Sequence, residues 1–509
     1  LIMPVLLCVG LFVQLHLRLV DEKPLTNSHK REAFKANYEK NFVDWQHKLQ
    51  PQVSHIDANI DFYPHQQFVK FDLTYTLENL HPTAIKQILV GRAGFYKWTN
   101  VKIAGATQIA FYPDLNQAVY EFDIALKPHE TRQLTTKFDI HQTTLWPASG
   151  HQIITPEFSY IRAVPALPTI GYQVNYELTD TQLRAQYGLQ QKARPLASTL
   201  FNEQQKRPKH YERITMSSKI STASGHQVVT QGKQITHQRE QGREIFEFKT
   251  LTEINNLPAW LSVPFTAATK KHDGVTLQVF AKKQQLIERS DAIAVNFQAM
   301  MDTLDWFKNN IVAYKPKQLS IIAAPPFGGT GYALPQIILV EDTVGFRARP
   351  SDDAGFDQRY RRAVHETAHQ WFGHEIGNSV SADSAFLIES MAKYIELVVI
   401  ERHDGKAAMN ALVDYETKRY EQVSRMDITE KMALIDSTKS YEQYSKATIV
   451  FAKLRKKIGD EAIIKALNLV WENHSHPNMP ATSMDFIFAL KEQVNPQLSS
   501  LIDKLFLEI

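Results

Sequence analysis

The segment HETAH at positions 365–369 has the residue types and the spacing that hold a metal ion. His365 and His369 lie four residues apart, so on a helix both imidazoles project from one face, with Glu366 beside them. Zinc accepts nitrogen and oxygen ligands in a tetrahedron, and three protein ligands leave the fourth position to a water whose pKa falls to about 7. The motif therefore predicts a hydrolytic centre with one Zn²⁺ per chain and Glu366 as its general base.

A third ligand must come from elsewhere in the chain. Glu389 stands in the apolar stretch DSAFLIESMAKYIELVVIE, with 19 residues (370–388) between it and His369. A carboxylate is costly to bury in such a stretch unless it has a partner, and a cation supplies one. The metzincin pattern fails, because Glu375 stands where its third histidine belongs. We predict Glu389 as the ligand, with Glu375 and Asp383 as alternatives.

The elements that must position these residues differ along the chain. From residue 51 the hydrophobic period is two, and apolar residues alternate with polar ones over 69–77, 118–126 and 134–140. This alternation predicts half-buried strands. Residues 51–265 are therefore expected to form an all-β domain.

Beyond residue 265 the apolar residues recur every three to four positions, which is the period of an α-helix. Ile293, Phe297, Met300, Leu304 and Phe307 form one stripe of a long helix. Two short apolar strands are expected at 319–324 and 336–340, separated by the Pro/Gly-rich loop PPFGGTGYALP, and the chain beyond 355 reads as helical to its end.

The first residues, LIMPVLLCVGLFVQLHLRLV (1–20), form a short apolar stretch. A spanning helix needs about 20 apolar residues, so we interpret residues 1–20 as the truncated end of a transmembrane segment whose beginning lies upstream. Without a basic n-region or a small-residue cleavage site, a signal peptide is disfavoured. Residues 21–50 are charged, like a helical tether. Basic residues in this flank favour a cytoplasmic side by the positive-inside rule, although one flank does not fix topology.

The composition excludes other classes of protein. Lys and Arg number 57 against 54 Asp and Glu, a net charge of +3 without a basic stripe, so nucleic acid is excluded as a partner. Cys8 is the single cysteine, which excludes an internal disulfide. A chain of 509 residues is too long for one hydrophobic core, which predicts two to four domains.

HETAHQWFG (365–373) followed by ESMAKYIE (389–396) resembles the aminopeptidase N family of gluzincin zinc peptidases. The family pattern is His-Glu-x-x-His-x18-Glu, with Gln-Trp-Phe-Gly after the second histidine. Here one extra residue intervenes, so that Ile388 occupies the strict family position. The longer spacing is used by thermolysin-like enzymes and by a branch similar to the aminopeptidases fused behind ABC-transporter permeases. That branch also has a membrane segment, a charged tether and a β-domain ahead of the peptidase.

The resemblance implies a multidomain α+β fold with an N-terminal membrane segment, an antiparallel β-sandwich-like domain, a thermolysin-like zinc peptidase domain and C-terminal helices. The peptidase domain is expected at 266–405, and helices at 406–509 complete the active site. Implied partners are a peptide substrate, the membrane and an ABC-transporter ATPase subunit. We expect the protein at the cell (inner) membrane, with its catalytic domain extracytoplasmic.

The family also uses a tyrosine, in a Tyr-x-Lys-Gly stretch, to donate a hydrogen bond to the oxyanion that forms at the scissile carbonyl. YEQYSKATIVF (441–451) matches through Tyr444 and Lys446, with Ala447 in place of the glycine. A phenol beside a cation is a good oxyanion donor. The resemblance therefore implies a catalytic role for Tyr444, with Tyr441 as the alternative.

One departure concerns recognition of a free N-terminus. The family binds the ammonium group with the glutamate of a Gly-x-Met-Glu-Asn-Pro segment, which corresponds here to GTGYALP (329–335). If Pro335 aligns with the family proline, Ala333 replaces that glutamate, and alanine does not pair with an ammonium. Glu341 or Asp342, a few residues on, is then the candidate substitute. Aminopeptidase-like selectivity is implied only by analogy.

Two functions follow from these observations. The first is a membrane-tethered zinc metallopeptidase that hydrolyses peptide bonds. The alternative is a non-catalytic, peptidase-fold substrate-binding or assembly domain of an ABC-transporter permease. Enzymes that have lost activity usually lack the base or a metal ligand. This chain keeps all five candidate site residues, which favours the enzyme. They are His365, Glu366, His369, Glu389 and Tyr444.

Overall fold

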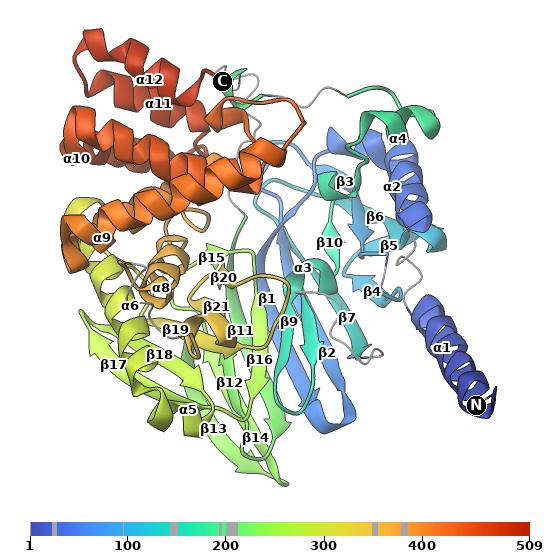
Figure 1. Ribbon diagram of the computed structural model, residues 1–509. Coiled ribbons are helices and arrows are strands. Elements are labelled where there is room, and N and C mark those ends of the chain that lie inside the picture. Colours follow the sequence, from blue (N-terminus) through green and yellow to red (C-terminus); the bar gives the residue numbers. More distant parts are fainter. Residues whose placement is uncertain are drawn as a thin grey trace. The chain divides into compact units, whose positions relative to one another are not determined.

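The computed structural model describes residues 2–22, 28–94, 96–142, 151–192, 196–199, 212–348, 355–377 and 385–509. The described residues divide into two compact units (Figure 1). The first unit draws on residues 1–193, 212–250 and 256–264, and the second on 194–211, 251–255 and 265–509. The motif residues therefore all lie in the second unit.

The first unit is built on a large sheet with the strand order β13-β14-β11-β1-β2-β7-β4. Its strands are β1 (Gln52–Tyr63), β2 (Phe68–Glu78), β4 (Asn100–Ile103), β7 (Thr131–His141), β11 (Arg213–Ala223), β13 (Lys233–Glu240) and β14 (Arg243–Lys249). The predicted alternation at 69–77 and 134–140 falls within β2 and β7. Strands β1 and β11 run parallel, whereas β2 is antiparallel to both β1 and β7, so the sheet is mixed and not purely antiparallel as predicted.

Two four-stranded sheets complete the first unit, with the orders β10-β3-β6-β5 and β12-β16-β9-β8. Their strands are β3 (Ile85–Gly91), β5 (Ala106–Tyr112), β6 (Gln117–Leu126), β8 (Gln152–Ile154), β9 (Ser159–Arg162), β10 (Thr169–Ile170), β12 (Gln227–Thr230) and β16 (Ala259–Val263). Trp260 of β16 packs edge-on against Phe71 of β2, and its Nε1 donates to Ser218 Oγ of β11 at 3.1 Å. The β12-β16-β9-β8 sheet therefore packs face to face on the large sheet, as in a sandwich.

Helix α2 (Ser28–Phe42) lies within the predicted tether and belongs to the first unit. Its Tyr38 and Phe42 are buried against that unit in a small aromatic cluster. Glu39 forms a buried bidentate ion pair with Arg184 of α4 (Thr181–Gln186), with N–O distances of 2.7 and 2.8 Å. The helix is therefore anchored by apolar contacts and by charge.

Helix α1 (Ile2–Glu22) precedes α2. Its side chains are exposed from Met3 to Gln14. Among the residues that the structure describes, we find no helix whose length and hydrophobicity together suffice to cross a membrane.

The second unit contains a five-stranded sheet with the order β17-β18-β19-β21-β20. Its strands are β17 (Thr266–His272), β18 (Val275–Ala281), β19 (Gln318–Ala324), β20 (Gly331–Leu334) and β21 (Ile337–Glu341). The apolar strands expected at 319–324 and 336–340 correspond to β19 and β21, which run parallel. The short strand β20 pairs antiparallel with β21 and forms one edge of the sheet.

Helices make up most of the rest of the second unit, which also includes the short strand β15 (Ile254–Asn255) (Figure 1). They are α5 (Lys283–Glu288), α6 (Ser290–Asn310), α7 (Asp342–Gly345), α8 (Gln358–Ala368), α9 (Met391–Met426), α10 (Ala447–His474), α11 (Ser483–Glu492) and α12 (Ser499–Phe506). Two π-helical turns, η7 (Phe386–Ser390) and η9 (Glu442–Lys446), directly precede α9 and α10. The apolar stripe predicted for α6 is buried. An aromatic core joins η7, α10, α11 and α12 through Phe386, Phe451, Phe486 and Phe506.

Candidate active site

Helix α8 supplies both histidines of the motif. His365 and Glu366 lie in its last two turns, and His369 caps its C-terminal end with helical backbone angles. The chain then reverses at Gly373, whose φ of 110° lies in the left-handed region that favours glycine. The glycine after Gln-Trp-Phe therefore reverses the chain four residues beyond the second histidine, after α8 has ended at Ala368.

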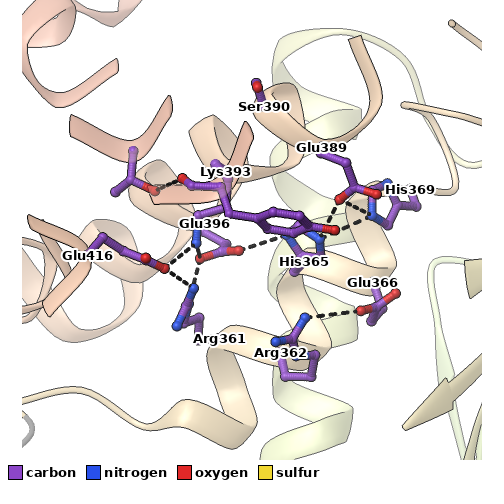
Figure 2. Close-up of polar contacts among 12 residues, drawn as sticks. Arg361, Arg362, His365, Glu366, His369, Glu389, Ser390, Lys393, Glu396 and Glu416 are labelled. Atoms are coloured by element: carbon purple, nitrogen blue, oxygen red, sulfur yellow. Dashed lines mark hydrogen bonds and ion pairs between the residues drawn. The ribbon is translucent and has the colours of Figure 1, made fainter. Parts of the chain in front are cut away.

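Three side chains converge beside α8 (Figure 2). The Nε2 atoms of His365 and His369 are 3.2 Å apart, and Oε2 of Glu389 lies 3.2 Å from the first and 3.5 Å from the second. Ligand atoms about 2.0–2.2 Å from a tetrahedral ion lie roughly 3.3–3.6 Å from one another. Two imidazole nitrogens and one carboxylate oxygen at these separations fit zinc.

The third ligand, Glu389, stands in the π-helical turn η7. A π-turn holds one residue more than an α-helical turn and is common at functional sites. This extra residue explains how the 19-residue spacing still delivers a carboxylate to the histidines. Ile388, at the strict family position, packs against Gly373 and Gly377 instead. Of the two alternatives for the ligand, Glu375 does not belong to the cluster and Asp383 lies outside the described residues.

Both histidines are oriented by a partner on the other ring nitrogen. Nδ1 of His365 lies 2.7 Å from Oε1 of Glu396, and Nδ1 of His369 lies 3.1 Å from the carbonyl oxygen of Phe372. Nδ1 of His369 donates to a carbonyl and Nδ1 of His365 lies at ion-pair distance from a carboxylate, so in both rings Nε2 is the nitrogen that faces the donor set. Our sequence interpretation missed Glu396, although its signal is present: it is a second acid on the same apolar helix, seven residues after Glu389.

The charge state of the donor set follows from its burial and its pairing. Burial opposes the charged imidazolium of His369, but the neighbouring carboxylate of Glu389 outweighs this and raises the pKa of His369 to about 9. Burial also opposes ionisation of Glu389, yet the two histidines hold its pKa well below the usual range. In the metal-free donor set a protonated His369 therefore pairs with the Glu389 carboxylate, and zinc would bind by displacing that proton.

Glu366 lies beside the donor set with 3% of its surface exposed. Oε1 is 3.4 Å from a guanidinium nitrogen of Arg362, one turn earlier on α8. On the other side, the backbone of β20 approaches so closely that a Cβ at Gly331 would lie 2.1 Å from Oε1. A side chain at this position would therefore displace the Glu366 carboxylate.

Of the two candidate tyrosines, the structure brings Tyr444 to the site. Its ring lies 5.6 Å from the His365 ring, centroid to centroid. Burial, followed by the charge of Glu389 and a hydrogen bond to it, raises the phenol pKa well above the usual range. Tyr444 therefore carries its proton at neutral pH. Tyr441 instead donates to Oδ2 of Asp427 at 2.7 Å, at the end of α9.

Gln370 joins the edge strand to α8. Its Oε1 accepts from the backbone N–H of Gln336 at 2.8 Å, and its Nε2 donates to the carbonyl of Leu334 at 3.0 Å. These two bonds fix the β20–β21 turn against the helix that carries the histidines. Trp371 stacks on Phe307 of α6 with centroids 3.8 Å apart. Gln370 and Trp371 of the Gln-Trp-Phe-Gly segment thus hold α8 against the sheet edge and against α6.

The three residues considered for N-terminal recognition lie in β20 and β21. Ala333 pairs with Ile338, two residues beyond Gly331 and hence on the same face of the sheet. Glu341 ends β21, and its backbone N–H donates to the carbonyl of Thr330 at 3.0 Å. The carboxylate of Asp342 binds Arg347 and Gln285. Neither acid belongs to the metal-ligand cluster of the described residues.

The donor set yields a direct prediction. Losing a residue that only holds a metal ligand in place typically weakens metal affinity about 10–100-fold. Replacing one of the ligands themselves (His365, His369 or Glu389) by alanine is therefore expected to weaken zinc binding by more than about 100-fold. Glu396→Gln is expected to fall within the range of about 10–100-fold. Zinc content of the dialysed full chain, measured by mass spectrometry of the metal, tests both expectations. Glu375→Ala serves as the matched control. Full zinc retention by Glu389→Ala would show that another residue is the third ligand.

Comparison with known proteins agrees with this geometry. Residues 295–505 match the model of the peptidase family M1 domain. Over 264 residues the chain is 24% identical to aminopeptidase N of Streptomyces lividans, an alignment that covers 49% of this chain. The aligned part spans 30% of the length of that protein.

Solved structures show the same fold. An M1 zinc metallopeptidase from Deinococcus radiodurans superposes with a TM-score of 0.63 and 14% identity, over 90% of this chain and 93% of that one. A mutant of that enzyme, bound to a Tyr-Ser-Ala substrate, gives a TM-score of 0.61 and 14% identity, over 90% and 94% of the two chains.

Proposed function

We propose that the chain is an active, zinc-dependent metallopeptidase of the M1 type that hydrolyses peptide bonds in an aminopeptidase-like manner. The match of residues 295–505 to the model of the peptidase family M1 domain supports this proposal. One observation carries the proposal. A base, Glu366, and a protonated phenol, Tyr444, flank a donor set that fits one zinc ion. A non-catalytic domain has no need for the base or for the phenol.

The roles of the residues follow from their positions. When bound, zinc supplies Lewis acidity that polarises a substrate carbonyl and lowers the pKa of water. Glu366 then accepts a proton from the attacking water. Tyr444 donates a hydrogen bond to the oxyanion that develops on the scissile carbonyl, where such a donor acts most strongly because the site is buried. The glycine of β20 lets the strand pass close to Glu366, so an extended peptide can pair with this edge and place its carbonyl nearby.

A short peptide is the proposed substrate class. The D. radiodurans mutant is bound to a Tyr-Ser-Ala substrate, which makes this tripeptide a suitable first probe. Mass spectrometry of the products would reveal whether the first residue is released. Intact peptide after long incubation with the zinc-loaded chain would contradict the proposal.

Selectivity for a free amine is expected to be weak. Ala333 carries no charge, and Asp342 is already paired with Arg347, so a fixed anion for the substrate ammonium is missing from the expected position. Tyr-Ser-Ala and its N-acetylated form should therefore be cleaved with kcat/KM values within about tenfold, or about 1.4 kcal/mol. A preference of a hundredfold or more for the free amine would contradict this expectation. Loss of such a preference in Glu341→Ala or Asp342→Ala would locate the anion at a displaced position.

Helix α1 supports a further part of the proposal, membrane tethering. Met3, Leu7 and Phe12 are 83%, 66% and 71% exposed, so apolar side chains face outward around the helix. We expect the full chain to sediment with lipid vesicles and the double variant Leu7→Asp/Phe12→Asp to stay in solution. Equal sedimentation of the two proteins would contradict a role for α1.

From the sequence resemblance we also propose that the catalytic domain is extracytoplasmic at the cell membrane. We propose further that the chain associates with an ABC-transporter ATPase subunit. Protease accessibility in intact cells would test the first, and co-purification of an ATPase subunit from membranes would test the second.

A further inference from the structure

The residues on either side of Tyr444 are both hydrogen-bonded to elements outside their own π-turn, η9. Before it, the backbone carbonyl of Gln443 accepts from Ser390 Oγ at 3.0 Å. After it, Ser445 Oγ donates to Oε2 of Glu416 at 2.6 Å. Ser390 and Ser445 are both fully buried. The backbone that carries the phenol is therefore held from both sides.

A π-turn needs such support. Its hydrogen bonds run from residue i to residue i+5, a pattern that is rare and less regular than the α-helical ladder. Ser390 is the last residue of the other π-turn, η7, directly after the ligand Glu389. The Ser390–Gln443 bond therefore joins the turn that supplies the third ligand to the turn that supplies the phenol.

Glu416, which binds Ser445, belongs to a buried charge cluster (Figure 2). We use this name for two cations and two carboxylates: Arg361, Lys393, Glu396 and Glu416. Arg361 and Lys393 each contact both carboxylates, with Lys393 Nζ 3.0 Å from Glu416 and Arg361 Nε 2.7 Å from Glu396. The opposite charges balance, and Glu396 contacts the ligand His365.

The cluster connects His365 to Ser445: Glu396 contacts His365, Glu416 binds Ser445, and Arg361 and Lys393 bridge the two carboxylates. Burying four charges is expensive, and well-packed apolar residues would stabilise the fold at least as well. A satisfied polar network instead fixes the orientation of its members, because each bond restricts the next. The location of the cluster, between a metal ligand and the oxyanion donor, therefore favours a role in positioning over a role in stability alone.

We propose that Ser390, Ser445 and the buried charge cluster are positioning elements: they hold Tyr444 at the distance from the donor set that the transition state requires. The inference rests on the proposed function, in which Tyr444 binds the oxyanion. None of these residues reaches the reacting atoms. Ser390 and Ser445 act through the backbone of η9, and Glu396 also contacts the ligand His365.

A double-mutant cycle tests this inference on the zinc-loaded full chain. Ser390→Ala and Ser445→Ala are expected to lower kcat about tenfold each, with KM and zinc content unchanged. In a Tyr444→Phe background, the same changes should alter kcat less than about twofold, because the group that they position is gone. Ser445→Thr keeps a hydroxyl and should recover most of the rate. Thr303→Val removes a buried hydroxyl of α6 that bonds only within its own helix, and should leave kcat unchanged.

A binding measurement gives a readout that does not need turnover. A phosphinic peptide mimics the tetrahedral oxyanion, and its Kd can be measured by calorimetry. Ser445→Ala should weaken this Kd about tenfold when Tyr444 is present and hardly at all in Tyr444→Phe. Equal losses in both backgrounds, or no loss in either Ser variant, would overturn the inference. If Tyr444→Phe itself binds and turns over like the wild type, the role of Tyr444 in the proposed function fails instead.

Discussion

Glu366→Gln is expected to abolish most turnover while the protein keeps its zinc. The glutamine has nearly the same volume, and Glu366 does not belong to the donor set of His365, His369 and Glu389. What the substitution removes is the carboxylate that accepts a proton, and general-base catalysis typically contributes about 10²–10⁴-fold. We therefore expect kcat to fall by that order with one zinc per chain retained. Peptide hydrolysis and metal analysis of the same sample would measure both.

Glu375→Gln is the matched control for this experiment. It makes the same chemical change in an acid near the motif that lies outside the donor set, so both the rate and the zinc content should stay close to wild type. If Glu366→Gln hydrolyses peptides as fast as the wild type, Glu366 is not the base. In that case any residual turnover belongs to another group, and the non-catalytic alternative gains support.

The second large effect is expected for Tyr444→Phe. The phenol hydrogen bond forms mainly to the oxyanion, so its loss should lower kcat by about 10²–10³ and change KM little. Burial and the neighbouring Glu389 keep the phenol protonated, so this donor should operate over the whole neutral range. Steady-state kinetics with a tripeptide would separate kcat from KM.

Tyr441→Phe is the control that distinguishes the two tyrosines. Its hydroxyl bonds Asp427, at the far end of α9, and removing it should leave kcat within a few-fold of wild type. A near-normal Tyr444→Phe beside a crippled Tyr441→Phe would reassign the oxyanion donor. The structure argues against that outcome, because it brings only Tyr444 next to His365.

Some parts of the site were predictable because they depend on local rules. A helix places residues four apart on one face, so His365 and His369 were bound to meet. Glu389 was recognisable as a ligand because an acid in an apolar stretch is costly to bury without a cation beside it. Strands at β2, β6 and β7 followed from strict alternation of apolar and polar residues.

Other parts depend on tertiary contacts that no local pattern reveals. The π-turns that present Glu389 and Tyr444 leave no periodic signal, because each spans a single turn. The parallel pairing of β1 with β11 joins strands more than a hundred residues apart. Gly331 gains its meaning only when the edge strand meets Glu366. Contacts between residues far apart in the sequence determine the geometry of the site, and a short stretch of sequence does not reveal them.

The most direct test of the account is the zinc dependence of peptide hydrolysis. Full-length chain would be stripped of metal with a chelator, then titrated with zinc while Tyr-Ser-Ala cleavage is followed by mass spectrometry. We predict no cleavage by the stripped chain, and activity that rises linearly and reaches its plateau at one zinc per chain, the capacity of the His365–His369–Glu389 set. Cleavage that is equal with and without metal, or a fully zinc-loaded chain that leaves the peptide intact, would contradict the account.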